Sequence, residues 1–178
     1  MEAPRGVFNP HNTITTLLLA YTAIKHEKCT PTIIAEPGAG TATISLIYAK
    51  ICRPHTIIIT DIDPKAIQTA KKNTEKNKQA HITHPAQCNW LDCIRPNTIQ
   101  TALLNPPYLP CHEKIAPQLC CNPDCNKLAE AIKSTIKTAK TIIYTTSTHT
   151  PIKTPGKTIN TTTLWKEKIH VKTITHNH

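Results

Sequence analysis

The chain has 178 residues, of which 39% are hydrophobic, and it carries a formal charge of +10 at pH 7. This length suffices for one domain with a buried core, expected over residues 1–178, and the apolar content excludes an intrinsically disordered protein. The positive charge favours anionic neighbours such as RNA or ribosome-associated partners, although the scattered lysines fit an ordinary solvated surface equally well.

The N-terminal sequence gives no sign of export or membrane insertion. Met1 to Pro4 carry no basic segment, and the apolar run at residues 17–20 is too short to cross a bilayer. We therefore expect a cytoplasmic protein with no membrane contact. The eight cysteines are then expected to be mostly reduced, since cytosolic disulfides are rare outside hyperthermophiles.

A helix is expected at about residues 13–26, after a loop that begins at Val7. Leucine, alanine and tyrosine side chains form its apolar stripe, and Asn12 or Thr13 is a suitable N-cap. The helix belongs to the core in this interpretation, while the loop before it is a candidate cover for a ligand.

A strand, a glycine turn and a helix follow in direct succession. The strand covers residues 31–35, the turn carries Glu36, Gly38 and Gly40, and the helix runs over about 43–51. Glycine lets the backbone approach a ligand closely, so this context predicts a nucleotide-type site. The Gly-Lys-Ser/Thr of a phosphate loop is absent and Glu36 repels phosphate, so a cationic, amine-bearing ligand such as S-adenosylmethionine fits better.

A second strand, at residues 56–60, is followed by Asp61. Asp63 and Pro64 are a good N-cap and first residue for a helix that runs to about Asn77. Asp61 lies at the carboxyl end of its strand, where a carboxylate can accept hydrogen bonds from both ribose hydroxyls of a nucleoside. An ordinary turn aspartate is the alternative.

Residues 81–84 are a weak strand candidate, and they lead to Asn89 and Trp90. Asn89 would reach the same sheet edge and accept a hydrogen bond from an adenine amino group. Ile62 and Trp90 would pack against the base, although tryptophan is more often a core residue than a cofactor contact.

A short apolar strand at residues 102–104 ends in Asn105-Pro106-Pro107-Tyr108. Neither proline has an N–H for a sheet ladder, so the chain must leave the sheet here, at the carboxyl edge where open α/β sheets bind ligands. The Asn105 side-chain carbonyl and the Pro106 peptide carbonyl are two acceptors for a planar NH2 group, and Tyr108 can stack on the flat group that carries it. Two acceptors favour the tetrahedral nitrogen that attack requires, whereas an ordinary Pro-Pro turn is the alternative reading of the same residues.

Three motifs in this order resemble those of the class I S-adenosylmethionine-dependent methyltransferases: Glu36-x-Gly38-x-Gly40, Asp61-Ile62-Asp63-Pro64 and Asn105-Pro106-Pro107-Tyr108-Leu109-Pro110. More narrowly, the chain resembles the short archaeal and eukaryotic form of the HemK/PrmC glutamine N5-methyltransferases. The Val-Tyr-x-Pro start of that form is similar to residues 7–10, and its last hairpin is similar to residues 164–171. The likeness extends over nearly the whole chain.

The resemblance implies a Rossmann-like α/β fold with a mostly parallel sheet, helices on both faces and a C-terminal antiparallel hairpin at about residues 158–175. It implies S-adenosylmethionine as cofactor and methylation of a glutamine side chain in a peptide chain release factor. A small zinc-binding activator protein is the usual heterodimer partner of this form. The implied catalytic residues are Asn105, Pro106, Pro107 and Tyr108, and the implied cofactor-binding residues are Glu36, Gly38, Gly40, Asp61, Ile62, Asn89, Trp90 and Asn105.

The sequence departs from the family pattern in several places. Asn89 stands where aspartate is common, so an acceptor is kept but a charge is lost, and cofactor affinity is expected to be lower. A threonine of the family's N-terminal loop aligns ambiguously with Thr13 or its neighbours. Only residues 149–157 separate a strand at about 141–146 from the hairpin, so the helix usual there is expected to be missing or reduced to a loop.

Cysteines and a histidine replace a glycine-rich segment of the family, in which Asp124 matches the family's aspartate. A zinc site, a disulfide and free thiols are all open for these side chains. Free thiols are favoured over zinc because the spacing is not Cys-x2-Cys and adjacent cysteines do not easily bind one ion, so no metal ligand is predicted. The residues concerned are Cys111, His112, Cys120, Cys121 and Cys125.

Two other functions stay open. The Asn-Pro-Pro-Tyr turn suits the exocyclic amine at adenine N6 or guanine N2 of RNA or DNA equally well, and the positive charge favours such a substrate. Against it, the chain has no room for a target-recognition domain, and a base in a duplex must be flipped out. The third possibility is a non-catalytic scaffold that keeps the fold.

Overall fold

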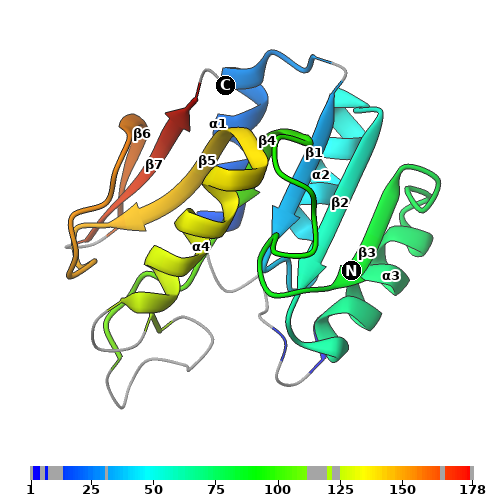
Figure 1. Cartoon of the computed structure of the whole chain (residues 1–178), viewed down its shortest axis with the longest axis horizontal. Helices are drawn as coiled ribbons and strands as arrows, with labels where there is room; N and C mark the ends of the chain where they lie inside the picture. The colour runs from blue at the N-terminus through cyan, green and yellow to red at the C-terminus, as the bar shows by residue number, and fades with distance from the viewer. Residues whose placement is uncertain are drawn as a thin grey trace.

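The computed structural model describes residues 2–4, 7, 14–30, 32–111, 120–121, 125–164 and 167–176. Four helices and seven strands lie in this part of the chain (Figure 1). The helices are α1 (Thr15–Glu27), α2 (Thr43–Cys52), α3 (Pro64–Lys76) and α4 (Asn126–Thr138). The strands are β1 (Ile33–Pro37), β2 (Thr56–Asp61), β3 (Thr83–Gln87), β4 (Ile99–Leu104), β5 (Ala139–Ser147), β6 (Lys157–Leu164) and β7 (Glu167–Thr175).

The strands form one sheet in the order β3-β2-β1-β4-β5-β7-β6. The first five run in parallel, whereas β7 is antiparallel to both β5 and β6. From β1 the chain builds outward to β3 on one side and then returns to place β4 and β5 on the other. The strand order therefore reverses between β1 and β4, which is where open α/β sheets bind ligands, outside the carboxyl ends of the strands.

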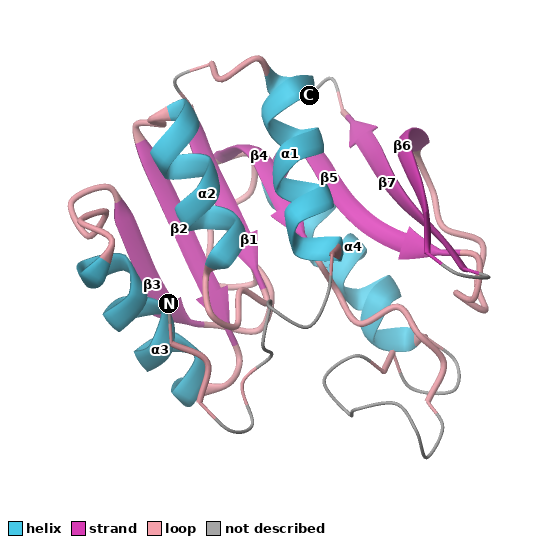
Figure 2. Cartoon of the chain, turned by 180° about the vertical axis from the view of Figure 1, so that it is seen from behind, coloured by secondary structure: helices cyan, strands magenta, loops and turns pink. Residues whose placement is uncertain are grey.

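Helices cover both faces of the sheet, as expected. α1, α2 and α3 lie on one face and α4 lies on the other (Figures 1 and 2). Each face has its own cluster of buried side chains, and burial of each large aliphatic group stabilises the fold by roughly 1.5–3 kcal/mol. The first cluster includes Leu19, Ile34, Tyr48 and Ile57, and the second includes Leu104, Leu128, Ile132 and Ile142.

The structure confirms most of the expected elements with small shifts. The strand expected at residues 81–84 is instead β3, which contains Pro85. Proline is tolerated there because β3 is an edge strand of the sheet. α1 has its N-cap at Ile14, without a side-chain capping bond, whereas the predicted caps Asn12 and Thr13 lie outside the described residues.

Helix α4 has no counterpart among the elements expected from the sequence, although its buried residues Leu128, Ala131, Ile132 and Thr135 follow helical spacing. The residue before α4, Cys125, has a left-handed conformation and makes no side-chain capping bond. Cysteine is not one of the preferred N-cap residues, so the usual sequence signal for a helix start is absent at this position.

The C-terminal part of the chain agrees with the expected departure from the family pattern. Residues 148–156 contain no helix, and β6 and β7 pair as an antiparallel hairpin. The hairpin turn at residues 165–166 lies outside the described residues. None of the described helices is long and apolar enough to span a membrane.

The expectation of mostly reduced thiols is wrong for this structure, because all eight cysteines are paired in four disulfides. The turns bring the Cα atoms of each pair to between 4.5 and 6.0 Å, within the range that a disulfide spans. The sulfurs considered for a zinc site therefore bond to each other, while His112 and Asp124 lie outside the described residues. The pairs are Cys29–Cys52, Cys88–Cys93, Cys111–Cys120 and Cys121–Cys125.

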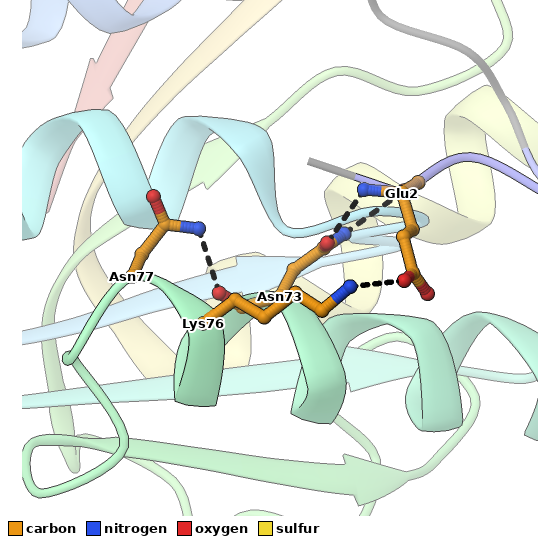
Figure 3. A network of polar contacts seen from close by, with 4 residues as sticks. All are labelled: Glu2, Asn73, Lys76 and Asn77. Carbon is orange, nitrogen blue, oxygen red and sulfur yellow. Dashed lines mark hydrogen bonds and ion pairs between the residues drawn. The ribbon is translucent and has the colours of Figure 1, made fainter.

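A buried asparagine of α3 binds the N-terminal segment (Figure 3) and also the segment after the glycine turn. The Asn73 side chain accepts a hydrogen bond from the Glu2 N–H at 2.7 Å and donates to the Glu2 carbonyl at 3.0 Å. It also donates to the Thr41 carbonyl at 3.1 Å, and Lys76 pairs with the Glu2 carboxylate. Asn73 therefore fixes the segment that lies between Gly40 and α2.

Candidate functional site

Three of the predicted site residues meet at one edge of the sheet. β1 is in register with β2 up to Pro37 and Thr60, and β4 lies parallel on the other side of β1. Gly38 follows β1, Asp61 is the last residue of β2, and Asn105 follows β4. All three therefore lie at the carboxyl ends of the neighbouring strands β1, β2 and β4, and the strand order reverses between β1 and β4.

The turn after β1 is built from left-handed backbone conformations, with φ of +66° at Gly38, +55° at Gly40 and +59° at Ala42. A β-carbon at Gly38 would lie 2.9 Å from Cζ3 of Trp90. Both the backbone conformation and the available space therefore require glycine at position 38.

Glu36 is only 3% exposed, and its Oε2 accepts a hydrogen bond from the Ser45 N–H at 2.7 Å. The N-cap of α2, Ala42, provides no side-chain capping bond. Glu36 in β1 instead accepts a hydrogen bond from a backbone N–H in the first turn of this helix, and its carboxylate lies at the positive end of the helix dipole. Burial raises the pKa of the Glu36 carboxyl to about 7, while hydrogen bonds from Ser45 and Ile44 act in the opposite direction. The predicted contact with the methionine end of a cofactor stays a prediction.

Asp61 ties the glycine turn to β2. Its Oδ2 accepts a hydrogen bond from the Gly40 N–H at 2.8 Å, and its Oδ1 accepts one from the Asp63 N–H at 2.9 Å. Burial raises the pKa of Asp61, and these backbone hydrogen bonds oppose that shift. Each carboxylate oxygen has a second lone pair, so Asp61 keeps the capacity to accept two ribose hydroxyls.

The segment after β3 is held by hydrogen bonds from α4. The Ser134 hydroxyl donates to Asp92 Oδ1 at 2.7 Å and accepts from the Leu91 N–H at 3.2 Å. Asp92 Oδ2 in turn accepts from Asn89 Nδ2 at 3.2 Å. Because Asp92 binds the amino group of this carboxamide, the Asn89 carbonyl points elsewhere and suits the predicted acceptor role toward adenine. Asn89 and Ile62 are both exposed.

Trp90 lies both in the core and at the site. Its half-buried ring packs against the second core cluster and lies beside Gly38, where an added β-carbon would come within 2.9 Å of it. Its carbonyl accepts a hydrogen bond from the Thr60 hydroxyl at 2.5 Å. The core and site interpretations of Trp90 are thus compatible, and the contact with adenine stays a prediction.

The Asn105 side chain is half-buried between two threonines. Its Oδ1 accepts a hydrogen bond from the Thr145 hydroxyl at 2.5 Å, and its Nδ2 donates to the Thr16 hydroxyl at 3.4 Å. Pro106 is buried and Pro107 is half-buried.

Tyr108 anchors the other end of the Asn-Pro-Pro-Tyr turn. It is only 8% exposed and belongs to the second core cluster. Burial raises the pKa of its hydroxyl, and a hydrogen bond with the Thr15 side chain opposes that shift. Most of the ring thus packs in the core, and stacking on a target group stays a prediction.

Sequence reasoning missed four residues that hold the site residues in place: Thr16, Asp92, Ser134 and Thr145. Their contacts join elements that are distant in the sequence, and the two bonds to Asn105 span 89 and 40 residues. Threonine is frequent in this chain, so residue type alone could not single out Thr16 and Thr145.

The fold is that of the class I S-adenosylmethionine-dependent methyltransferases. Residues 4–121 match the family described as Methyltransferase small domain. Because this match covers more than half of the sequence, the chain belongs to that family.

Similarity to individual curated proteins is confined to part of the chain. The release factor glutamine methyltransferase of Moorella thermoacetica is 30% identical over 84 residues, which is 47% of this chain and 30% of that protein. The matches cover 16% and 26% of two further curated relatives. The chain thus spans less than a third of the length of the relatives it matches.

Solved structures share the fold over most of the chain. The human methyltransferase 10 domain containing protein superposes with a TM-score of 0.69 at 13% identity, covering 98% of this chain and 87% of that one. An RNA methyltransferase from Salinibacter ruber, solved in complex with S-adenosyl-L-homocysteine, has a TM-score of 0.58 at 12% identity, covering 91% and 93%.

The residues at the strand ends fit S-adenosylmethionine. Gly38 presents exposed backbone, Asp61 offers carboxylate oxygens for the ribose, and Asn89 offers a carbonyl for the adenine amino group. Glu36 supplies a buried acidic group beside the glycine turn, which suits a cationic ligand. S-adenosylmethionine is therefore the cofactor that this family and this donor set imply.

Proposed function

We propose that this protein transfers a methyl group to a planar amide nitrogen, namely the glutamine side chain of a peptide chain release factor. The observation that carries the proposal is the position of Asn105 at the end of β4, beside the turn that follows β1 and contains Gly38, with Asp61 at the end of β2 bonded to that turn. An acceptor for an NH2 group thus stands next to a turn suited to an adenosyl sulfonium compound. The local similarity to a release factor glutamine methyltransferase supports this choice of amide.

The bound cofactor supplies a methyl group activated by a positively charged sulfur. With the cofactor bound, Asp61 would hold the ribose and Glu36 would provide an acidic group for the cationic end. The Asn105 side-chain carbonyl and the Pro106 carbonyl hold the two hydrogens of the target amide. As the N–C bond forms and the C–S bond breaks, positive charge develops on nitrogen and strengthens these hydrogen bonds.

Proton release needs no strongly shifted general base. The methylated nitrogen is acidic, so its proton can pass to water after transfer, and the sulfur leaves as a neutral thioether. The contribution of the chain is alignment of donor and acceptor together with acceptors for the amide hydrogens.

A second candidate function is methylation of an exocyclic amine in a nucleic acid, at adenine N6 or guanine N2. The net charge of +10 favours it, and the Salinibacter ruber structure of the same fold is that of an RNA methyltransferase. The same acceptors at Asn105 and Pro106 would hold such an amine.

The two candidates are separated by offering both substrates. The purified protein is incubated with methyl-labelled S-adenosylmethionine and either release factor or total RNA. Label in the release factor, lost when its target glutamine is replaced by alanine, supports the first function, and label in RNA alone supports the second. Label in neither substrate, together with no cofactor binding by calorimetry, would favour a non-catalytic protein that keeps the methyltransferase fold.

The Asn105→Ala variant tests the assigned role of the turn. We expect turnover to fall at least a hundredfold because the main acceptor for the target amine is lost, while cofactor affinity measured by calorimetry stays nearly unchanged. Equal loss of turnover and of cofactor affinity would count against this role.

We further propose that a small zinc-binding activator protein forms a heterodimer with this chain, as in the short form that the sequence resembles. Co-expression followed by size-exclusion chromatography and the labelling assay tests this. A rise in activity with a stable 1:1 complex is expected, and full activity of the isolated chain with no complex would oppose the proposal.

A further inference from the structure

We propose that Thr145 and Thr16 are positioning residues that fix which end of the Asn105 carboxamide meets the target. The inference rests on the proposed function, because it concerns the residue that holds the target amine. It goes beyond that function by assigning roles to two hydroxyls outside the Asn-Pro-Pro-Tyr turn.

The two threonines come from different elements on either side of Asn105. Thr145 is in β5, which pairs with β4 up to Leu104 and Tyr144, so Thr145 lies level with Asn105. Its side chain is fully buried. Thr16 is in the first turn of α1 and is 3% exposed.

The distances distinguish the two ends of the carboxamide. The Thr145 hydroxyl lies 2.5 Å from Oδ1, which is at the short limit of O–H···O bonds and below the range of N–H···O bonds. The Thr16 hydroxyl lies 3.4 Å from Nδ2, which suits a longer bond with a nitrogen donor. A buried hydroxyl also needs a partner, and Oδ1 provides one for Thr145.

This arrangement leaves one acceptor position on Oδ1. A carbonyl oxygen has two lone pairs, of which Thr145 uses one, so the other is available for a hydrogen of the target NH2 group. If the carboxamide turned by 180°, it would present N–H groups to the target, and two donors would then face each other. A hydroxyl can donate or accept, so the short separation at Thr145, which suits an oxygen better than a nitrogen, is what selects the orientation in which Asn105 accepts.

The kinetic test uses Thr145→Val, which keeps the side-chain shape and removes the hydroxyl, and Thr145→Ser, which keeps the hydroxyl. With release factor as substrate, we expect Thr145→Val to lower kcat about tenfold, the effect of one hydrogen bond of ordinary strength. KM for the cofactor should stay unchanged, and Thr145→Ser should restore most of the rate. Thr16→Val should have a smaller effect, because its bond is longer.

The next residue in β5 provides a matched control. Thr146 is 2% exposed, but its hydroxyl contacts Thr150 at 2.9 Å and not Asn105. Thr146→Val should therefore change stability to a similar extent as Thr145→Val while leaving kcat at the wild-type value. An equal loss of kcat in both variants would overturn the positioning role.

An NMR measurement tests the contact without any turnover. The side-chain amide signals of Asn105 are identified in 15N-labelled protein by their loss in Asn105→Ala. Thr145→Val should shift these signals and speed their exchange with solvent, whereas Thr146→Val should leave them in place. Unchanged signals in Thr145→Val would overturn the inference, whereas a wild type inactive on every substrate with the expected NMR pattern would remove only the proposed function.

Discussion

Glu36, Asp61 and Asn105 each make a fixed contact within the chain. The Glu36 carboxylate binds the Ser45 N–H under α2, Asp61 binds the Gly40 N–H, and Asn105 lies between two hydroxyls. Such contacts hold the acceptor oxygens in place before any ligand arrives. Fixed acceptors need little rearrangement when charge develops on a reacting atom.

Glu36 makes the stability of the protein depend on pH. Its pKa is about 7 in the folded chain and about 4.5 when unfolded. Between these pH values the folded state keeps a proton that the unfolded state has released, so rising pH favours unfolding. The stability contribution is full below pH 4.5 and is lost by pH 7, a change of about 3 kcal/mol.

The Glu36→Gln variant isolates this effect, because glutamine can still accept the Ser45 hydrogen bond but does not titrate. We expect the free energy of unfolding, measured by urea denaturation, to fall between pH 4.5 and pH 7 by about 3 kcal/mol more in the wild type than in the variant. Parallel pH profiles of the two proteins would contradict the burial of an ionisable group here.

At the scale of elements, the glycine turn after β1 is held by hydrogen bonds from two other elements, β2 and α3. Asp61 of β2 holds the Gly40 N–H, and Asn73 of α3 binds the Thr41 carbonyl. Asn73 is fully buried and also contacts the backbone of Glu2 (Figure 3). The position of the turn therefore depends on α3 and on the N-terminal segment as well as on its own glycines.

Replacing Asn73 by alanine should destabilise the fold by about 2–3 kcal/mol, since a buried backbone carbonyl and the Glu2 backbone lose their partners. The matched control is Asn77→Ala, which removes one hydrogen bond, to the Asn73 carbonyl at 2.7 Å, from an exposed side chain of the same helix end. We expect the control to cost less than about 1 kcal/mol. Urea denaturation compares the two, and equal losses would refute the central role of Asn73.

The whole molecule combines a basic surface with few ion pairs. Among the described residues, the ion pairs are His26–Glu27 and Lys76–Glu2, so most of the 21 lysines and arginines have no acidic partner in that part of the chain. A hollow of about 420 Å³ between α4 and residues 152–155 is rimmed by Lys133, Lys137 and Lys153. It shares no residue with the candidate site.

Because four disulfides cross-link the chain, we expect the stability of the whole fold to depend on redox conditions. Cys29–Cys52 joins the ends of α1 and α2 with a sequence separation of 23, and closing a loop of that length stabilises a fold by about 3 kcal/mol. Alkylation without reduction, read by mass spectrometry, should label none of the eight cysteines. The Cys29→Ser/Cys52→Ser variant should lose about 3 kcal/mol of unfolding free energy. Eight labelled thiols in the oxidised wild type would contradict the pairing.

The sequence by itself determined the features that depend on local chain geometry. Prolines after β4 end that strand at Asn105, glycines at positions 38 and 40 permit the left-handed turn, and Asp63 caps α3 by accepting from the Lys65 N–H. Apolar runs indicated β1, β2 and β4, whereas the α/β class followed from the resemblance to a known family. These signals lie within a few residues of the structure they predict.

Only the tertiary structure decided which distant groups meet. The partners of Asn105, the support of Asn89 from Ser134 and the pairing of the cysteines depend on helices and strands far apart in the sequence. Likewise, the start of α4 carries no N-cap signal at Cys125, which makes no side-chain capping bond. The sequence does not show which group a hydroxyl or a thiol will bind, because that partner is determined by the packing of the folded sheet.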